Sequence, residues 1–203
     1  MSPRTGPPGD REAAHVAGAP LRADAARNVA QIRAAAIAAF RGRGLDTPLE
    51  EIAAAAGVSK ATIYNRFGGR AGLIDAVIGT LVAAEMHAIM DKALHVADPW
   101  QAIATYVTDR RDLQYREPAF TDALLMSYPE SGQLAVIATA AIDMTTSLVQ
   151  RSHDAGVIRR DFTAGDLYYA DVANGLALRK LPRPARQDYD RRVRFFLDSL
   201  RPR

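Results

Sequence analysis

The sequence predicts an all-α protein, and three observations support that prediction. Apolar residues recur at spacings of three and four along most of the chain, the period that places them on one face of a helix. No stretch alternates apolar and polar residues with the period of two expected of a half-buried strand. Pro, Gly, Asp, Ser and Thr stand between the periodic stretches, where they can start and stop helices.

The first 22 residues are expected to form a disordered arm, because they are rich in Pro, Gly, Ala and Arg and almost lack large apolar side chains. Arginines in such an arm can reach phosphates or a minor groove. For Arg4 and Arg11 the favoured interpretation is a solvated tail without fixed contacts. Arg22 and Arg27 flank the start of the first helix and are better placed to contact phosphate.

The first helix is predicted over residues 28–40. From Ile32 onward its apolar positions form one stripe that ends at Phe40, and Gly42 and Gly44 follow. Its expected role is to pack against the next two helices and set their angle, with Phe40 in the core.

Residues 47–67 predict two short helices joined by a sharp turn, a helix-turn-helix. Thr47 is expected to cap the first helix in a reciprocal pair with Glu50, with the following proline at the first helical position. Gly57 suits the left-handed conformation that ends a helix, and Ser59 is placed to cap the second helix.

The second of these helices divides into an apolar and a polar face. Ile63 and Phe67 are expected to point inward, while the remaining side chains carry a cation, hydroxyls and an amide. Such groups suit phosphate oxygens and base edges in a major groove. The alternative is an ordinary helical corner with a polar surface. The polar set is Ser59, Lys60, Thr62, Tyr64 and Asn65.

These motifs resemble the DNA-binding domain of the TetR family of transcriptional regulators over residues 24–80. The runs that carry the resemblance are RGLDTPLEEIAAAAGVSKATIYNRF and GGRAGLIDAVI, which follow each other directly from Arg43. The chain departs from the family pattern at Ala71 and Gly72, where an acidic residue usually opens the next helix, but it keeps the basic residue Arg70.

The resemblance implies three parts: an N-terminal arm over residues 1–22, a three-helix DNA-binding domain over 23–70, and a helical ligand-binding and dimerisation domain over 71–203. It also implies a sequence-specific regulator, most often a repressor, that binds a pseudo-palindromic DNA operator as a homodimer and is released by a small-molecule effector. The alternative is a non-specific or architectural DNA binder without a ligand switch. The DNA-binding residues expected from the motif are Arg27, Thr47, Ser59, Lys60, Ala61, Thr62, Tyr64, Asn65 and Arg70.

The rest of the chain continues the helical pattern. A fourth helix follows Arg70 and, by resemblance, links the two domains. Asp98 and Pro99 mark the start of the next helix, and a short helical segment begins at Pro118. Three further helices are predicted at about 133–153, 163–180 and from 186 onward, and by resemblance the last two pair with a second subunit.

An effector pocket among these helices is expected to be apolar, as small-molecule pockets usually are. We assign no residue as a ligand contact, because each residue that could line the pocket is equally suited to ordinary core packing. The residues considered are Met86, Met90, Trp100, Tyr106, Met126, Tyr128 and Met144.

Charge is distributed unevenly. The net charge is +3, and residues 1–80 hold ten Lys and Arg against seven Asp and Glu, so the whole excess lies in the half with the helix-turn-helix. A phosphate-binding surface requires such an excess, although three charges are few.

Several function classes lack support in the sequence. There is no Cys, no catalytic motif and no phosphate-binding Gly loop, so we expect no enzyme and no cofactor. The sequence shows neither a secretory signal nor an apolar run of about 20 residues. We therefore expect a cytoplasmic protein that does not contact a membrane. His87, Asp91 and His95 share a helix face and could bind a metal, but a solvated polar face is the favoured interpretation.

Overall fold

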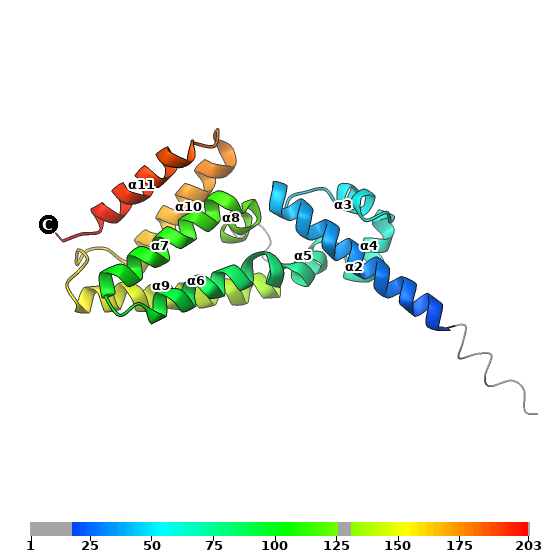
Figure 1. Ribbon diagram of the computed structural model, residues 1–203, viewed down its shortest axis with the longest axis horizontal. Coiled ribbons are helices and arrows are strands. Elements are labelled where there is room, and N and C mark those ends of the chain that lie inside the picture. Colours follow the sequence, from blue (N-terminus) through cyan, green and yellow to red (C-terminus); the bar gives the residue numbers. More distant parts are fainter. Residues whose placement is uncertain (1–17, 126–130, 203) are drawn as a thin grey trace, which may run out of the picture.

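The computed structural model describes residues 18–125 and 131–202, and within them every regular element is a helix. Figure 1 shows an elongated molecule with the N-terminal helices at one end and the C-terminal helices at the other. The elements in order are α2 (Gly18–Arg43), α3 (Leu49–Ala55), α4 (Lys60–Phe67), α5 (Arg70–Ile78), the π-helix η1 (Gly79–Ala83), α6 (Ala84–His95), α7 (Pro99–Arg116), α8 (Pro118–Leu124), α9 (Gly132–Asp154), α10 (Ala164–Lys180) and α11 (Arg186–Ser199).

The N-terminal end has the predicted helix-turn-helix. Ile32 and Phe40 of α2 and Ile63 of α4 have no exposed surface, so α2 holds the two short helices by their apolar faces. Gly57 has a φ of 67°, and its left-handed conformation makes the sharp turn between α3 and α4.

The predicted capping pair of Thr47 and Glu50 is wrong. α3 begins at Leu49, one residue later than predicted, with Pro48 at its N-cap, and the Thr47 hydroxyl donates to the carbonyl of Gly44 at 2.9 Å. The Thr47 hydroxyl therefore forms a hydrogen bond within the tight loop before α3 instead of capping the helix. The Glu50 carboxylate binds Lys60.

The predicted fourth helix is one continuous rod, α5–η1–α6, with a π-helical turn in its middle. Asp98 accepts from the N–H of Gln101 at 2.7 Å and caps α7, as the sequence predicts. The expected helices near 133–153, 163–180 and 186 are found as α9, α10 and α11.

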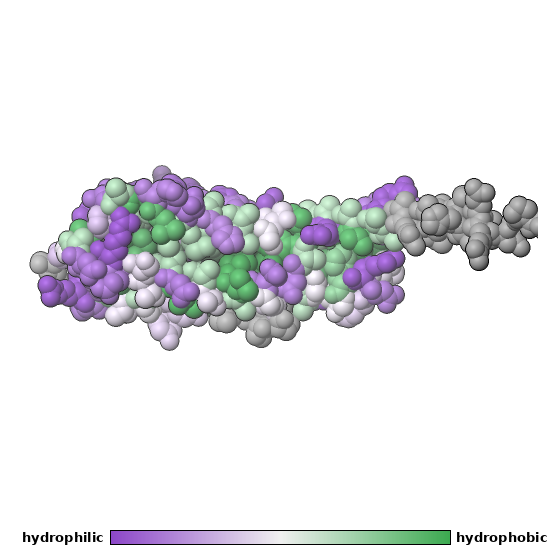
Figure 2. All heavy atoms as spheres, turned by 90° about the horizontal axis from the view of Figure 1, so that it is seen from below, coloured by the Kyte–Doolittle hydropathy of each residue, from purple (hydrophilic) through white to green (hydrophobic). Residues whose placement is uncertain are grey.

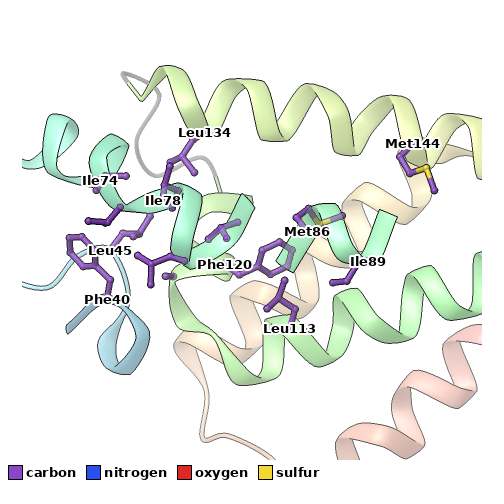
Figure 3. Packing of buried hydrophobic residues seen from close by; sticks show 14 of the residues in the cluster. Phe40, Leu45, Ile74, Ile78, Met86, Ile89, Leu113, Phe120, Leu134 and Met144 are labelled. Atoms are coloured by element: carbon purple, nitrogen blue, oxygen red, sulfur yellow. The ribbon is translucent and has the colours of Figure 1, made fainter. Parts of the chain in front are cut away.

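One hydrophobic core runs through both ends of the molecule and crosses the predicted boundary at residue 70. Figure 3 shows Phe40 and Leu45 beside Ile74, with Ile78, Phe120 and Met86 continuing toward the C-terminal helices. The two ends of the molecule therefore share one closely packed interior, and such interiors transmit strain.

Residues 70–95 and 132–154 form helices long and apolar enough to cross a membrane by length and composition, contrary to the sequence expectation. They are core helices of this fold: Ile74 and Val77 of the first and Leu148 of the second are buried. Their surface is partly apolar all the same, and Figure 2 shows apolar residues (green) along the middle of one face. Val136 and Ile142 of α9 are among the exposed apolar residues.

The predicted arm falls largely outside the described residues, as do Met126 and Tyr128. The helix α2 begins at Gly18, five residues before the expected domain start at 23.

Candidate DNA-binding surface and ligand cavity

The helix α4 presents one exposed face to solvent. Lys60, Ala61, Tyr64 and Asn65 are all exposed and follow the i, i+1, i+4, i+5 spacing of a single helix side, opposite the buried Ile63. These are four of the nine residues that the sequence predicts to contact DNA.

The start of α4 is fixed by its own cap. Ser59 accepts from the N–H of Thr62 at 3.2 Å, and the two hydroxyls lie 2.9 Å apart. The predicted cap is confirmed. Its consequence is that the half-buried Thr62 hydroxyl is engaged in the cap.

Lys60 is paired rather than free. Its ammonium donates to Glu50 on α3 at 2.6 Å and lies 5.8 Å from the ring centroid of Tyr64. The hydrogen bond to Glu50 raises the pKa of Lys60, and the same bond lowers the pKa of Glu50. The carboxylate therefore stands beside the cation that is expected to meet phosphate.

The Tyr64 ring packs over the turn that leads to α5. A Cβ added at Gly69 would lie 3.0 Å from its ring carbon, and Gly69 itself has a φ of 99°. Glycine at this position lets the ring lie against the backbone while half of Tyr64 stays exposed.

Two other predicted contacts point into the protein. Thr47 is only 3% exposed, with its hydroxyl bonded internally. The Arg70 guanidinium donates from Nη1 to the carbonyls of Leu45 and Thr47, both at 2.7 Å. Arg70 thus holds the loop between α2 and α3 in place. Arg27 lies exposed on α2 and pairs with Asp24 at 2.5 Å.

The same loop is anchored from the C-terminal helices. Asp122 on α8 accepts from the N–H of Leu45 at 2.7 Å and pairs with Arg179 of α10 at 2.8 Å. Burial raises the pKa of Asp122, although these two donors act in the opposite direction. Gly44 has a φ of 94°, and a Cβ there would come within 2.1 Å of the Asp122 carboxylate.

A cavity of about 330 Å³ lies between the helices of the C-terminal end. Its volume falls at the lower end of the range for small-molecule pockets. Met86 is one of the lining residues considered from the sequence, whereas Met90, Trp100, Tyr106 and Met144 do not line it. The lining residues are Val82, Met86, Arg110, Phe120, Ala123, Leu124, Leu134, Ile137, Ala138, Ala141, Ile142, Thr145, Ala164, Gly165 and Tyr168.

The sequence predicts a capping role for Glu50, whereas its carboxylate binds Lys60. Two other charges, Asp122 and Arg110, were overlooked, although each had a local signal. Asp122 and Arg110 interrupt otherwise apolar helix faces, and a charge on such a face calls for a partner. Their partners, Asp171 for Arg110 and Arg179 for Asp122, lie far away in sequence, so the pairing could not be predicted. Among the described residues no cluster suitable for a metal ion is found, and His95 Nδ1 instead lies 2.8 Å from the Asp91 carbonyl.

Comparison with known proteins assigns the N-terminal end. Residues 32–77 match the model of the family described as bacterial regulatory proteins, tetR family. Residues 32–77 form a domain of the TetR family. The protein is a DNA-binding transcriptional regulator, from a family of regulators rather than enzymes.

Solved structures agree with this fold. A TetR transcriptional regulator of Streptomyces coelicolor is 28% identical, with a TM-score of 0.53 over 85% of this chain and 97% of that one. The ketosteroid transcriptional regulator of Mycobacterium tuberculosis (17% identity, TM-score 0.61) covers 85% of this chain and 94% of its own. The TetR family regulator PfmR of Thermus thermophilus is 21% identical, with a TM-score of 0.58 over 82% of this chain and 94% of that one. A search of curated proteins finds no match.

Proposed function

We propose that this TetR-family regulator is a cytoplasmic repressor that binds a pseudo-palindromic operator as a homodimer and leaves it when a small molecule fills the cavity. The observation that carries the DNA-binding part is the exposed face of α4. It combines a cation, a phenol and an amide on one side of a short, capped helix. A helix of this kind places its N-terminal residues against base edges.

Within this surface the residues have different expected roles. Lys60 contacts a DNA phosphate, Asn65 reads a base edge, and the Tyr64 hydroxyl donates a hydrogen bond to the DNA backbone. Ser59 and Thr62 hold the helix start, and Thr62 reads a base only if its hydroxyl leaves the cap. Thr47 and Arg70 act as positioning residues, because both are bonded to the loop between α2 and α3.

Dimerisation is supported by the outer surfaces of α10 and α11. Tyr169 is 72% exposed, Leu176 44% and Phe195 64%, which is unusual exposure for large apolar side chains. An isologous pairing of these helices would bury them and would present two copies of α4 to two half-sites.

Release by a ligand has a physical route through α8. Phe120, Ala123 and Leu124 of α8 line the cavity, and Asp122 of the same helix holds the loop before α3. A ligand that prefers a displaced α8 shifts the equilibrium toward a helix-turn-helix position that no longer fits DNA. The shift is bounded by the ligand's differential affinity for the two positions.

The DNA-binding assignment is tested by fluorescence anisotropy with a set of duplexes at several salt concentrations. Lys60→Ala should weaken binding to all sequences alike and lower the salt slope by ~1. Asn65→Ala should relax the preference at one position per half-site, at a cost of about 1–3 kcal/mol for the preferred base. Lys92→Ala removes an exposed, paired lysine of α6 and serves as the matched control.

Unchanged slope and base preference in both α4 variants would contradict the assignment. Tight binding without any base preference, lost as salt rises, would favour a non-specific DNA binder instead.

A further inference from the structure

A buried charge cluster beside the cavity has one more positive than negative charge. Arg110 and Arg111 of α7 are 6% and 7% exposed, and Asp171 of α10 is 2% exposed. Asp171 lies 3.0 Å from Nη1 of Arg110 and 3.0 Å from Nε of Arg111. One carboxylate thus faces two guanidinium groups. An unbalanced buried charge is costly unless a further partner compensates it.

No other acidic group of the described residues supplies that partner. Asp109 pairs with Lys92, and Asp112 pairs with Arg116 and Arg186, all toward the surface. The neutral Tyr106 hydroxyl lies 3.4 Å from Nη1 of Arg110.

Arg110 is also the member of the cluster that faces the cavity. Its Nε is buried and has no hydrogen-bond partner among the described residues, and its 3.0 Å approach to Asp171 lacks hydrogen-bond geometry. Among the described lining residues it alone carries a charge, and the walls are otherwise mainly aliphatic side chains of α9 and α8. An incompletely bonded cation therefore borders an apolar cavity.

We propose that the cavity binds an amphiphilic monocarboxylate, with its carboxylate on Arg110 and its hydrocarbon part along α9. This inference rests on the proposed ligand-responsive function and names its effector class. A single excess positive charge matches a monoanion, whereas a phosphate monoester carries about −1.5 to −2 at neutral pH. At ~30 Å³ for each water-sized group, the cavity holds roughly eleven such groups, about the size of decanoate.

The test is isothermal titration calorimetry of the full chain, without DNA, with hexanoate, octanoate, decanoate and dodecanoate and with the alcohol of each length. Each carboxylate should bind at least tenfold more tightly than its alcohol, because a hydrogen bond to a charged group contributes that much or more. Affinity should rise with length up to about decanoate and then level off or fall, since the cavity is filled.

Variants locate the carboxylate. Arg110→Met should lower decanoate affinity about 10- to 100-fold and leave decanol affinity nearly unchanged. It should fold, because Arg111 and Asp171 remain as a balanced pair, and a thermal melt verifies this. Arg110→Lys keeps the charge and should retain a preference for decanoate over decanol. Arg191→Met removes an exposed cation of α11 and should change neither affinity.

The inference is overturned if no carboxylate of the series binds more tightly than its alcohol, or if the preference survives in Arg110→Met. Operator binding measured in parallel separates the two proposals. Arg110-dependent decanoate binding that leaves operator affinity unchanged would sustain the ligand class and contradict the effector role. Intact operator binding without any carboxylate preference would contradict the ligand class and leave the proposed DNA-binding function standing.

Discussion

At the residue scale, Glu50 reduces the positive charge of the α4 surface that we propose to bind DNA. Its carboxylate lies on α3 and binds the ammonium of Lys60 at 2.6 Å, on the exposed side of the helix-turn-helix. A phosphate that approaches Lys60 has to compete with this carboxylate and is repelled by it. Exposed ion pairs are weak, so the competition is modest.

Glu50→Gln should therefore strengthen binding to all DNA sequences roughly two- to fivefold at low salt, as expected from freeing one exposed pair. The measurement is a salt titration of duplex affinity. Glu51→Gln is the matched control, since Glu51 is a neighbouring acid of α3 that pairs with Arg43 instead. Equal effects of the two substitutions would show that only net charge matters, and weaker binding by Glu50→Gln would contradict the role given to Lys60.

Glu117, between α7 and α8, gives a prediction about pH. Its Oε2 is buried without a hydrogen-bond partner, and the nearest cationic atom, Nε of Arg41, is 3.9 Å from Oε1. Burial raises the pKa of this carboxyl in the folded protein. The folded state therefore holds the proton to higher pH than the unfolded state, and this contribution to stability is lost as pH rises through the folded pKa.

Glu117→Gln should accordingly be more stable than the wild type at pH 7, by up to about 1 kcal/mol, because the partly buried charge is removed. The difference should shrink as pH falls to about 4, where the wild-type carboxyl is protonated as well. Urea denaturation at the two pH values measures it. A wild type that is the more stable protein at pH 7 would contradict this account.

At the scale of elements, much of the fold follows from local sequence signals. Ser59, Gly57 and Asp98 each act within a few residues, and the structure confirms all three as caps or turn residues. The Thr47 cap failed because the neighbouring loop competes for the same hydroxyl. Asp122 and Arg110 escaped sequence reasoning because their roles depend on residues many positions away, and only tertiary packing brings those together.

The departure from the family pattern at Gly72 also has a reason in packing. A Cβ at this position would lie 1.7 Å from the carbonyl oxygen of Phe67, the last residue of α4. Glycine thus lets α5 approach the end of α4 more closely than any other residue allows.

Gly72→Ala should destabilise the protein by about 1–3 kcal/mol, because a backbone oxygen cannot move aside without shifting a helix. It should also weaken DNA binding by tilting α4 against α5. Gly79→Ala in the same rod meets nothing within 4 Å and is the control, expected to be neutral or slightly stabilising. Denaturation curves and anisotropy give both quantities. Equal stability of the two variants would refute the packing argument.

At the scale of the whole molecule, the exposed apolar surface of α10 and α11 is expected to be a subunit interface. Phe195→Glu places a charge in that surface and should shift the dimer toward monomer, with at least a tenfold weaker dimer association. Analytical ultracentrifugation measures the mass. Leu94→Glu alters a similarly exposed leucine of α6, 59% exposed, and should leave the dimer intact. A monomeric wild type, or a dimer unaffected by Phe195→Glu, would place the interface elsewhere.

The continuous core and the Asp122 contact join the two ends of the molecule into one mechanical unit. Under the proposed function, occupation of the cavity and the position of α4 are coupled, and each should bias the other to the same extent. The operator should accordingly weaken ligand binding by the same factor by which the ligand weakens operator binding.

Sequence-specific binding as a dimer is tested most directly by selection of bound duplexes from random DNA by the purified full chain, repeated at two salt concentrations. An inverted repeat should be enriched at both concentrations, with half-sites spaced for two copies of α4 in a dimer. Binding that enriches no motif and collapses as salt rises would contradict a sequence-specific dimeric regulator and leave only phosphate attraction.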